Sequence, residues 1–202
     1  MAVDACPRAL KMADREGAEV DLVICAASNM ERAYPAMAVE IQSLIGAGGF
    51  AFDMNVACSS ATFGIAQAVA LVQVGTANRV LVASPEICSG HLNFRDRDSH
   101  FIFGDACTAV IVERKQGCRS SNAFEVISTR LSTQFSNNIR NNRGFLTRCE
   151  DRPENDPALL FYQEGRKVFK EVTTLVSNLL SEHLGENELD PASVRCMWLH
   201  QA

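Results

Sequence analysis

The feature that most limits how this chain can fold is a run of 25 residues, from Met54 to Asn78, without a charged side chain. A run of this length could span a bilayer as a helix. Polar side chains interrupt it, however, at Asn55, Ser59, Ser60, Thr62, Gln67 and Gln73. We therefore predict a buried strand, a turn and a central helix ending at Gly75, because a helix that is apolar nearly all round belongs inside a protein.

Apolar runs and helical patterns alternate along the rest of the chain. Strands are predicted at 20–28, 50–57, 79–84, 124–132 and 194–199, and from the Gly104–Asp105 turn to Val112. Helices are predicted over 3–15, from Pro35 to Gly46, and over 158–184. Alternation of strands and helices favours an α/β sheet.

Composition excludes several classes of protein. The 202 residues carry 19 Lys and Arg against 24 Asp and Glu, a net charge of -5, and no long basic stripe, so nucleic acid is not expected as a main partner. The eight cysteines form no CxxC pair, which argues against paired zinc sites and thioredoxin-type motifs. The first residues carry acids and no long apolar core, so we expect no secretory signal, reduced thiols and a cytoplasmic protein.

Cys58 lies in NVACSSATFG, where the predicted strand meets the predicted helix. Free amide groups and the positive end of the helix dipole favour a thiolate at such a position. A backbone N–H there can also help to hold an oxyanion, and the small neighbours leave room for a substrate. The alternative is a structural cysteine packed under a helix.

His200 follows the predicted strand at 194–199, and α/β sheets place ligand sites at strand ends. Its N–H could polarise a carbonyl or stabilise a developing enolate. The alternative is a strand-end histidine that bonds to the backbone. The other histidines, at positions 91, 100 and 183, are expected to be structural or solvated.

Five ordered blocks resemble one family. They are DLVICAASN, YPAMAVEIQSLIGAGGFAFDMNVACSSATFGI, SGHLNFRDRDSHFIFGDACTAVIVE, YQEGRKVFKEV and WLHQA. Over essentially its whole length the chain is similar to the β-ketoacyl-acyl-carrier-protein synthase III family of the thiolase-like superfamily. The resemblance implies a layered α/β/α/β/α thiolase-like fold, incomplete at both termini. It assigns residues 1–118 to most of the first half of that fold and 119–202 to the beginning of the second half.

The resemblance also implies a reaction, the decarboxylative Claisen condensation of acyl-CoA with malonyl-acyl carrier protein in fatty-acid biosynthesis. In this family Cys58 would be the acylated nucleophile, and His200 would help to hold the malonyl thioester carbonyl. Arg97 matches an arginine that contacts CoA, Phe103 an aromatic near the cysteine, and Tyr34 an aromatic that reaches into the neighbouring subunit's acyl pocket. The family implies a homodimer without a cofactor, a metal or a membrane anchor.

The chain departs from the family in two places. Ala106 and Cys107 follow the Gly104–Asp105 turn where relatives have glycine, and the asparagine and oxyanion-hole loop that relatives supply after His200 are not in the sequence. Two alternatives therefore stay open. The chain could be a non-catalytic truncated fragment, or a related condensing enzyme of the hydroxymethylglutaryl-CoA synthase or type III polyketide synthase kind.

Overall fold

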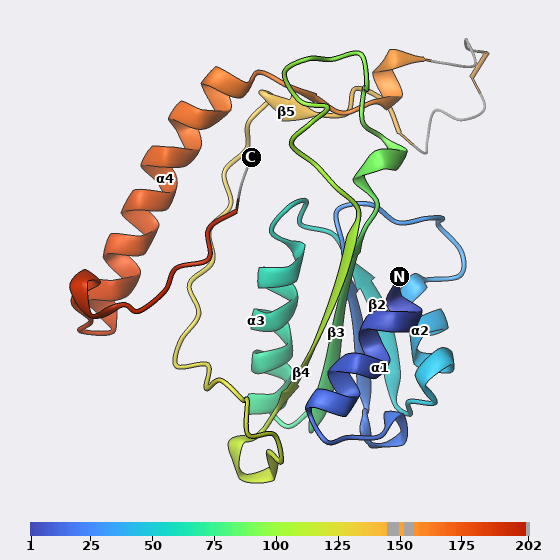
Figure 1. Cartoon of the computed structure of the whole chain (residues 1–202), viewed down its shortest axis with the longest axis vertical. Helices are drawn as coiled ribbons and strands as arrows, with labels where there is room; N and C mark the ends of the chain where they lie inside the picture. The colour runs from blue at the N-terminus through green and yellow to red at the C-terminus, as the bar shows by residue number, and fades with distance from the viewer. Residues whose placement is uncertain (145–149, 152–155, 201–202) are drawn as a thin grey trace. The chain divides into compact units, whose positions relative to one another are not determined.

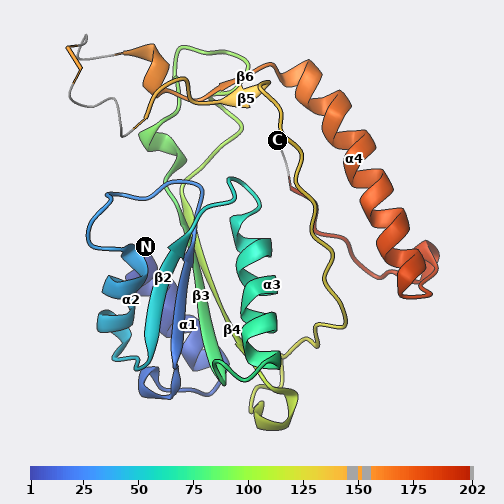
Figure 2. The same ribbon diagram turned by 180° about the vertical axis from the view of Figure 1, so that it is seen from behind.

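The structure is a computed structural model that describes residues 1–144, 150–151 and 156–200. The chain divides into two compact units, shown from opposite sides in Figures 1 and 2. The first unit comprises Met1–Ile87 and Asp105–Thr129, and the second comprises Cys88–Gly104 and Arg130–Ala202. The expected boundary at 118/119 concerns two halves of the family's fold, and it stays a prediction.

The first unit is built on a four-stranded sheet in the order β2-β1-β3-β4. The strands are β1 (Leu22–Ala26), β2 (Phe50–Met54), β3 (Arg79–Glu86) and β4 (Ala106–Glu113). β1 pairs in parallel with both β2 and β3, and β4 runs antiparallel to β3. The strands predicted at 20–28, 50–57 and 79–84 and up to Val112 are thereby confirmed. The three parallel strands end at the same edge of the sheet.

Helices cover both faces of this sheet. α1 (Ala2–Met12) and α2 (Met37–Ile45) lie on one face, and α3 (Ser60–Gln73) lies on the other (Figure 1). Successive residues of β1 point to opposite faces, so Val23 and Cys25 pack toward α1 and α2, whereas Ile24 and Ala26 pack toward α3. All five β1 residues are buried, which explains their continuous apolar pattern.

The charge-free run is divided as predicted, into β2, a turn and α3. β2 is not buried as predicted, however, because it lies at the edge of the described sheet and its residues are half-buried or exposed. Among the described residues, no helix combines the length and the apolar character needed to cross a membrane. The predicted end of α2 is also confirmed, because Gly46 caps it with a left-handed backbone at φ 68°.

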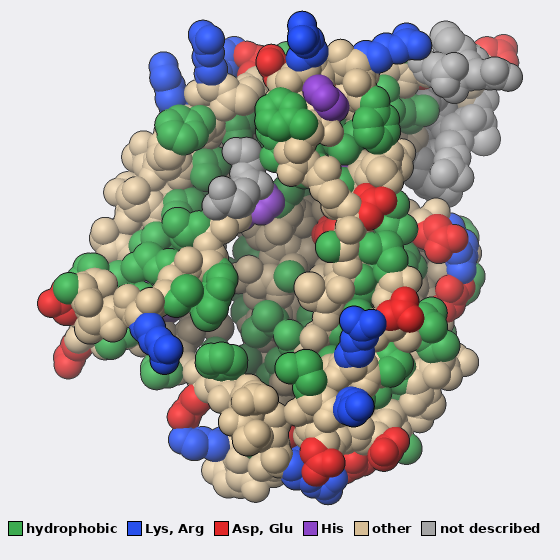
Figure 3. Space-filling view, viewed as in Figure 1, with side chains coloured by type: hydrophobic (Ala, Val, Ile, Leu, Met, Phe, Trp, Pro, Cys, Tyr) green, Lys and Arg blue, Asp and Glu red, His purple; other side chains and the backbone are tan. Residues whose placement is uncertain are grey.

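The second unit contains α4 (Gly165–Glu186) and a small antiparallel sheet of β5 (Ile139–Arg140) and β6 (Tyr162–Gln163). The helix predicted over 158–184 is confirmed but begins later. Pro157–Leu159 forms a short 3-10 turn, and Tyr162 and Gln163 pair with β5 before the helix begins. No described residue of α4 is fully buried, and Figure 3 shows hydrophobic side chains at the surface of this unit.

Two predicted strands are wrong. Residues 124–132 and 194–199 are irregular, and their large side chains point to solvent, with Phe124 90% and Trp198 84% exposed. Alternating apolar residues indicate a face to be buried, but a strand also needs a neighbour for its backbone hydrogen bonds. In the described part of the chain, neither segment has one.

Candidate active site at the carboxyl edge of the sheet

Cys58 lies in the tight turn between β2 and α3, at the edge where the parallel strands end. Ala57, the residue before it, adopts a left-handed backbone at φ 47°, which is strained for a residue with a side chain. The buried Ser60 hydroxyl accepts a hydrogen bond from the Val56 N–H at 2.8 Å and donates to the Ala57 carbonyl at 2.7 Å. The backbone is therefore held on both sides of Cys58.

Side chains from the ends of all three parallel strands meet at this turn. Asn55, after β2, donates to the Ser28 carbonyl after β1, and its side-chain oxygen accepts from the Ala57 N–H, both at 2.8 Å. Glu86, the last residue of β3, accepts from the Ser28 N–H at 2.8 Å and from the Ser28 hydroxyl. The nucleophile turn is thus connected to the whole edge of the sheet.

The charge state of Cys58 differs from the sequence-based expectation. Partial removal of its sulfur from water raises the pKa of the Cys58 thiol, and the Glu86 carboxylate adds to the rise, while the cysteine's own N–H opposes it. The thiol form is therefore favoured near neutral pH, and the predicted resting thiolate is not supported. Cys58 is one of seven described cysteines that are free thiols; Cys149 lies outside the described residues.

Tyr34 belongs to the same unit as Cys58, in the loop that leads into α2. Its side chain points into solvent, being 83% exposed. The start of α2 is fixed by Asp53 of β2, whose carboxylate accepts hydrogen bonds from the Met37 and Ala38 N–H groups at 2.9 and 2.7 Å. The loop carrying Tyr34 is therefore anchored to the strand that precedes Cys58.

Arg97 and Phe103 belong to the second unit. Asp96 shapes the exposed loop that presents Arg97, because its carboxylate accepts from the Asp98 N–H and the Ser99 hydroxyl, which lowers the Asp96 pKa. This loop borders a hollow of about 1180 Å³ that includes the start of α4. Phe103 is half-buried and packs edge to face against Phe161, with ring centroids 5.0 Å apart.

His200 is exposed and follows an irregular segment, so it does not lie at a strand's end as predicted. Gln201 and Ala202, the last two residues of the WLHQA block, lie outside the described residues. Of the candidate site residues, Cys58 and Tyr34 are in the first unit, whereas Arg97, Phe103 and His200 are in the second.

Sequence reasoning missed Ser28 and Glu86 as parts of the site. Each ends or follows a parallel strand, as Asn55 does. A search for polar residues at the carboxyl ends of all predicted parallel strands could have found them.

Comparisons of sequence identify relatives of this chain. The family model for 3-oxoacyl-acyl-carrier-protein (ACP) synthase III matches residues 52–134, which include Cys58. The chain is 58% identical over 202 residues to the β-ketodecanoyl-acyl-carrier-protein synthase of Pseudomonas aeruginosa, covering all of this chain and 58% of that protein. It is 32% identical over 203 residues to the β-ketoacyl-acyl-carrier-protein synthase III of Acidiphilium cryptum, covering all of this chain and 61% of that protein.

Comparison of structures gives the same result. The crystal structure of 3-oxoacyl-acyl-carrier-protein synthase III from Aquifex aeolicus superposes with a TM-score of 0.80 at 26% identity, covering 96% of this chain and 58% of the other. The chain thus spans about three-fifths of the length of the curated relatives it matches. The predicted resemblance to the β-ketoacyl-acyl-carrier-protein synthase III family, with its thiolase-like fold, is therefore confirmed by relatives that match all of this chain and by a solved structure that matches 96% of it.

Proposed function

We propose that Cys58 accepts an acyl group from acyl-CoA in a decarboxylative Claisen condensation that yields 3-oxoacyl-acyl carrier protein. The observation that carries the proposal is the position of Cys58, on a constrained turn between β2 and α3 in a chain that resembles synthase III. A rigid turn at a helix N-terminus presents a nucleophile and offers backbone N–H groups to an oxyanion.

The reaction has two steps. The Cys58 sulfur attacks the acyl-CoA carbonyl, the carbon–sulfur bond to CoA breaks, and CoA leaves as a thiol with the proton that Cys58 gives up. Malonyl-acyl carrier protein then loses CO2, and its carbanion attacks the acyl-Cys58 carbonyl. The cysteine leaves as a thiolate that regains a proton. Because the pKa of the Cys58 thiol is raised, the first step includes loss of the thiol proton, before or during the attack on the carbonyl.

The other candidate residues would serve the substrates. His200 would donate its N–H to the malonyl thioester carbonyl as the enolate develops. Arg97 would contact CoA from the exposed loop beside the second unit's hollow, and Phe103 would line the acyl path. The exposed Tyr34 would enter the acyl pocket of a second subunit in a homodimer. The proposed reaction uses acyl-CoA as a substrate and needs no resident cofactor or metal.

The acyl group is proposed to have eight carbons. The Pseudomonas aeruginosa relative, at 58% identity, is named for a β-ketodecanoyl product, which has ten carbons. Condensation with a decarboxylated malonyl unit adds two carbons, so the primer for such a product is an octanoyl group.

Acyl transfer is tested by incubating the chain with octanoyl-CoA and measuring the intact mass. We expect one octanoyl adduct, located on Cys58 by peptide mapping and absent from Cys58→Ala. Cys118→Ala, which removes another exposed cysteine, should acquire the same adduct as the unchanged chain. If Cys58→Ala acquired as much octanoyl adduct as the unchanged chain, the assignment of Cys58 as the acylated residue would be wrong.

The non-catalytic fragment stays a second candidate, because the chain covers only 58% of its 58%-identical relative. The condensation step distinguishes an active synthase from a non-catalytic fragment. Sustained formation of 3-oxodecanoyl-acyl carrier protein from octanoyl-CoA and malonyl-acyl carrier protein would exclude the fragment. Acylation without that product would support it.

A further inference from the structure

Glu86, the last residue of β3, makes two hydrogen bonds to one residue of another strand end. Its two carboxylate oxygens accept hydrogen bonds from the backbone N–H and the side-chain hydroxyl of one residue, Ser28, which lies 58 positions away in the chain. Hydrogen bonds to a charged acceptor are stronger than neutral ones, and two of them define the orientation of the acceptor's partner. Glu86 therefore fixes the position of Ser28 after β1.

Ser28 passes this constraint to the turn that carries the nucleophile. The Ser28 carbonyl accepts from the Asn55 amide group at 2.8 Å, and the Asn55 oxygen accepts from the Ala57 N–H at 2.8 Å. Ala57 is the left-handed residue next to Cys58. A strained backbone persists only where its surroundings over-determine it, and these hydrogen bonds supply that constraint.

We propose that Glu86 is a positioning residue for Cys58, which it holds in place through Ser28 and Asn55. The inference rests on the proposed function, in which Cys58 is acylated. Glu86 does not touch the acyl group in this scheme. It fixes the direction in which the sulfur is presented, and a nucleophile displaced by about 1 Å can lose roughly 100-fold in rate.

Glu86 also acts on Cys58 through its charge. α3 carries no ionisable side chain, and the carboxylate of Asp53 on β2 is bound to the N–H groups of α2. Among the described groups, Glu86 is the charged one whose field reaches Cys58, and it raises the thiol pKa in addition to burial. Hydrogen bonding and charge at Glu86 can therefore be separated by substitution.

The experiment compares Glu86→Gln, Glu86→Ala and Asn55→Ala in the full chain. Glutamine can accept from the Ser28 N–H and donate to the Ser28 hydroxyl, so it keeps the geometry and removes the charge. Glu125→Gln is the matched control, because Glu125 is an exposed glutamate of the same unit that pairs with Lys115. The readouts are the octanoylation rate of Cys58 and the pH profile of its alkylation by iodoacetamide, both followed by peptide mass spectrometry.

Glu86→Gln should lose much less of the acylation rate than Glu86→Ala does, and its alkylation profile should move to lower pH because removing the negative charge lowers the raised thiol pKa. Glu86→Ala and Asn55→Ala should each slow acylation roughly 10- to 100-fold. Their double variant should be no slower than the slower single one, because both act through one chain of hydrogen bonds.

The proposal is overturned if Glu86→Ala and Asn55→Ala acylate at the unchanged rate, or if their effects multiply in the double variant. An equal loss in Glu125→Gln would also overturn it. If Glu86→Ala does not fold, the acylation rate of Asn55→Ala and the alkylation profile of Glu86→Gln still test the proposal. If octanoyl-CoA leaves no adduct on the unchanged chain, the proposed function fails. Alkylation of Cys58 then tests the positioning role alone. Asn55→Ala changes no charge, so an alkylation rate equal to that of the unchanged chain overturns this role as well.

Discussion

At the scale of single residues, Gly64 sets how closely α3 approaches the sheet. A Cβ atom at this position would lie 2.8 Å from the Ala26 Cβ and 3.0 Å from Val82 Cγ1, so the helix would have to move. We predict that Gly64→Ala lowers the free energy of unfolding by about 1–3 kcal/mol, as overpacking does. This loss should exceed the gain of about 0.5–1 kcal/mol that alanine brings to a helix interior. Denaturant unfolding measures the difference.

Gly185→Ala in α4 is the matched control, because a Cβ there meets no atom within 4 Å. It should show the helix-propensity gain alone and leave the stability unchanged or higher. If both substitutions destabilised the protein equally, close packing at Gly64 would not be the cause.

At the scale of secondary-structure elements, Asp53 connects β2 to the first turn of α2. Its carboxylate accepts from the Met37 and Ala38 N–H groups, which have no partner inside the helix. We predict that Asp53→Ala destabilises the protein by about 1–2 kcal/mol, the usual cost of losing a helix cap. Hydrogen exchange of the Met37 and Ala38 amides should be faster in Asp53→Ala than in the unchanged chain.

Glu40→Gln tests whether any acidic side chain near the start of α2 protects the Met37 and Ala38 amides as Asp53 does. Glu40 also lies in the first turn, but it is an exposed partner of Arg32 rather than a cap. Its substitution should leave the Met37 and Ala38 exchange rates unchanged. Unchanged exchange in Asp53→Ala would contradict the capping role.

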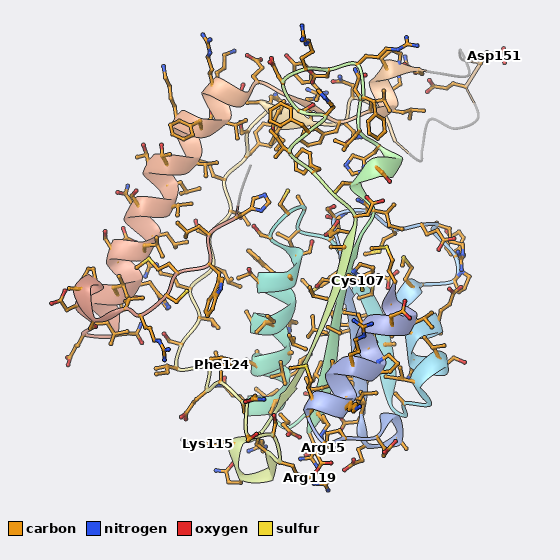
Figure 4. All side chains as sticks on the ribbon, viewed as in Figure 1. Arg15, Cys107, Lys115, Arg119, Phe124 and Asp151 are labelled. Atoms are coloured by element: carbon orange, nitrogen blue, oxygen red, sulfur yellow. The ribbon has the colours of Figure 1, made fainter. Side chains whose placement is uncertain are left out.

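At the scale of the whole molecule, the first unit is assembled from two stretches of chain, and a buried ion pair joins them. Arg15, with a side chain only 2% exposed, pairs with Glu113 at 2.9 Å and donates to the Gly117 carbonyl. Figure 4 shows Arg15 and Arg119 at the same end of this unit. We predict that Arg15→Met costs about 1.5–3 kcal/mol, the usual loss for a hydrogen bond to a charged group, because Glu113 keeps Arg79 as a partner at 2.6 Å. Thermal and denaturant unfolding measure the loss.

Arg119→Met provides the comparison. Arg119 pairs with Glu19 at 3.3 Å, but its side chain is 53% exposed, so the loss should stay within about 1 kcal/mol. Equal losses for the two arginines would mean that burial does not determine the strength of this network.

Local pattern was sufficient for the elements around Cys58. Apolar runs and their periodicity predicted β1, β2 and β3 and the helices between them, because each signal lies within one short segment. The same reasoning failed at 124–132 and 194–199. A local apolar pattern carries no information about whether a neighbouring strand exists to pair with it.

The amino-acid sequence by itself determined the α/β class, the strand–Cys58–helix unit and the family resemblance, which depend on local patterns and on their order along the chain. The tertiary structure alone decided what surrounds Cys58. Ser28 and Glu86 come together from 58 positions apart, and Ser28 and Asn55 from 27, because parallel strands end at one edge of the sheet. It also decided the sign of the Cys58 pKa shift, since burial and the nearby carboxylate outweigh the local amides that favour a thiolate.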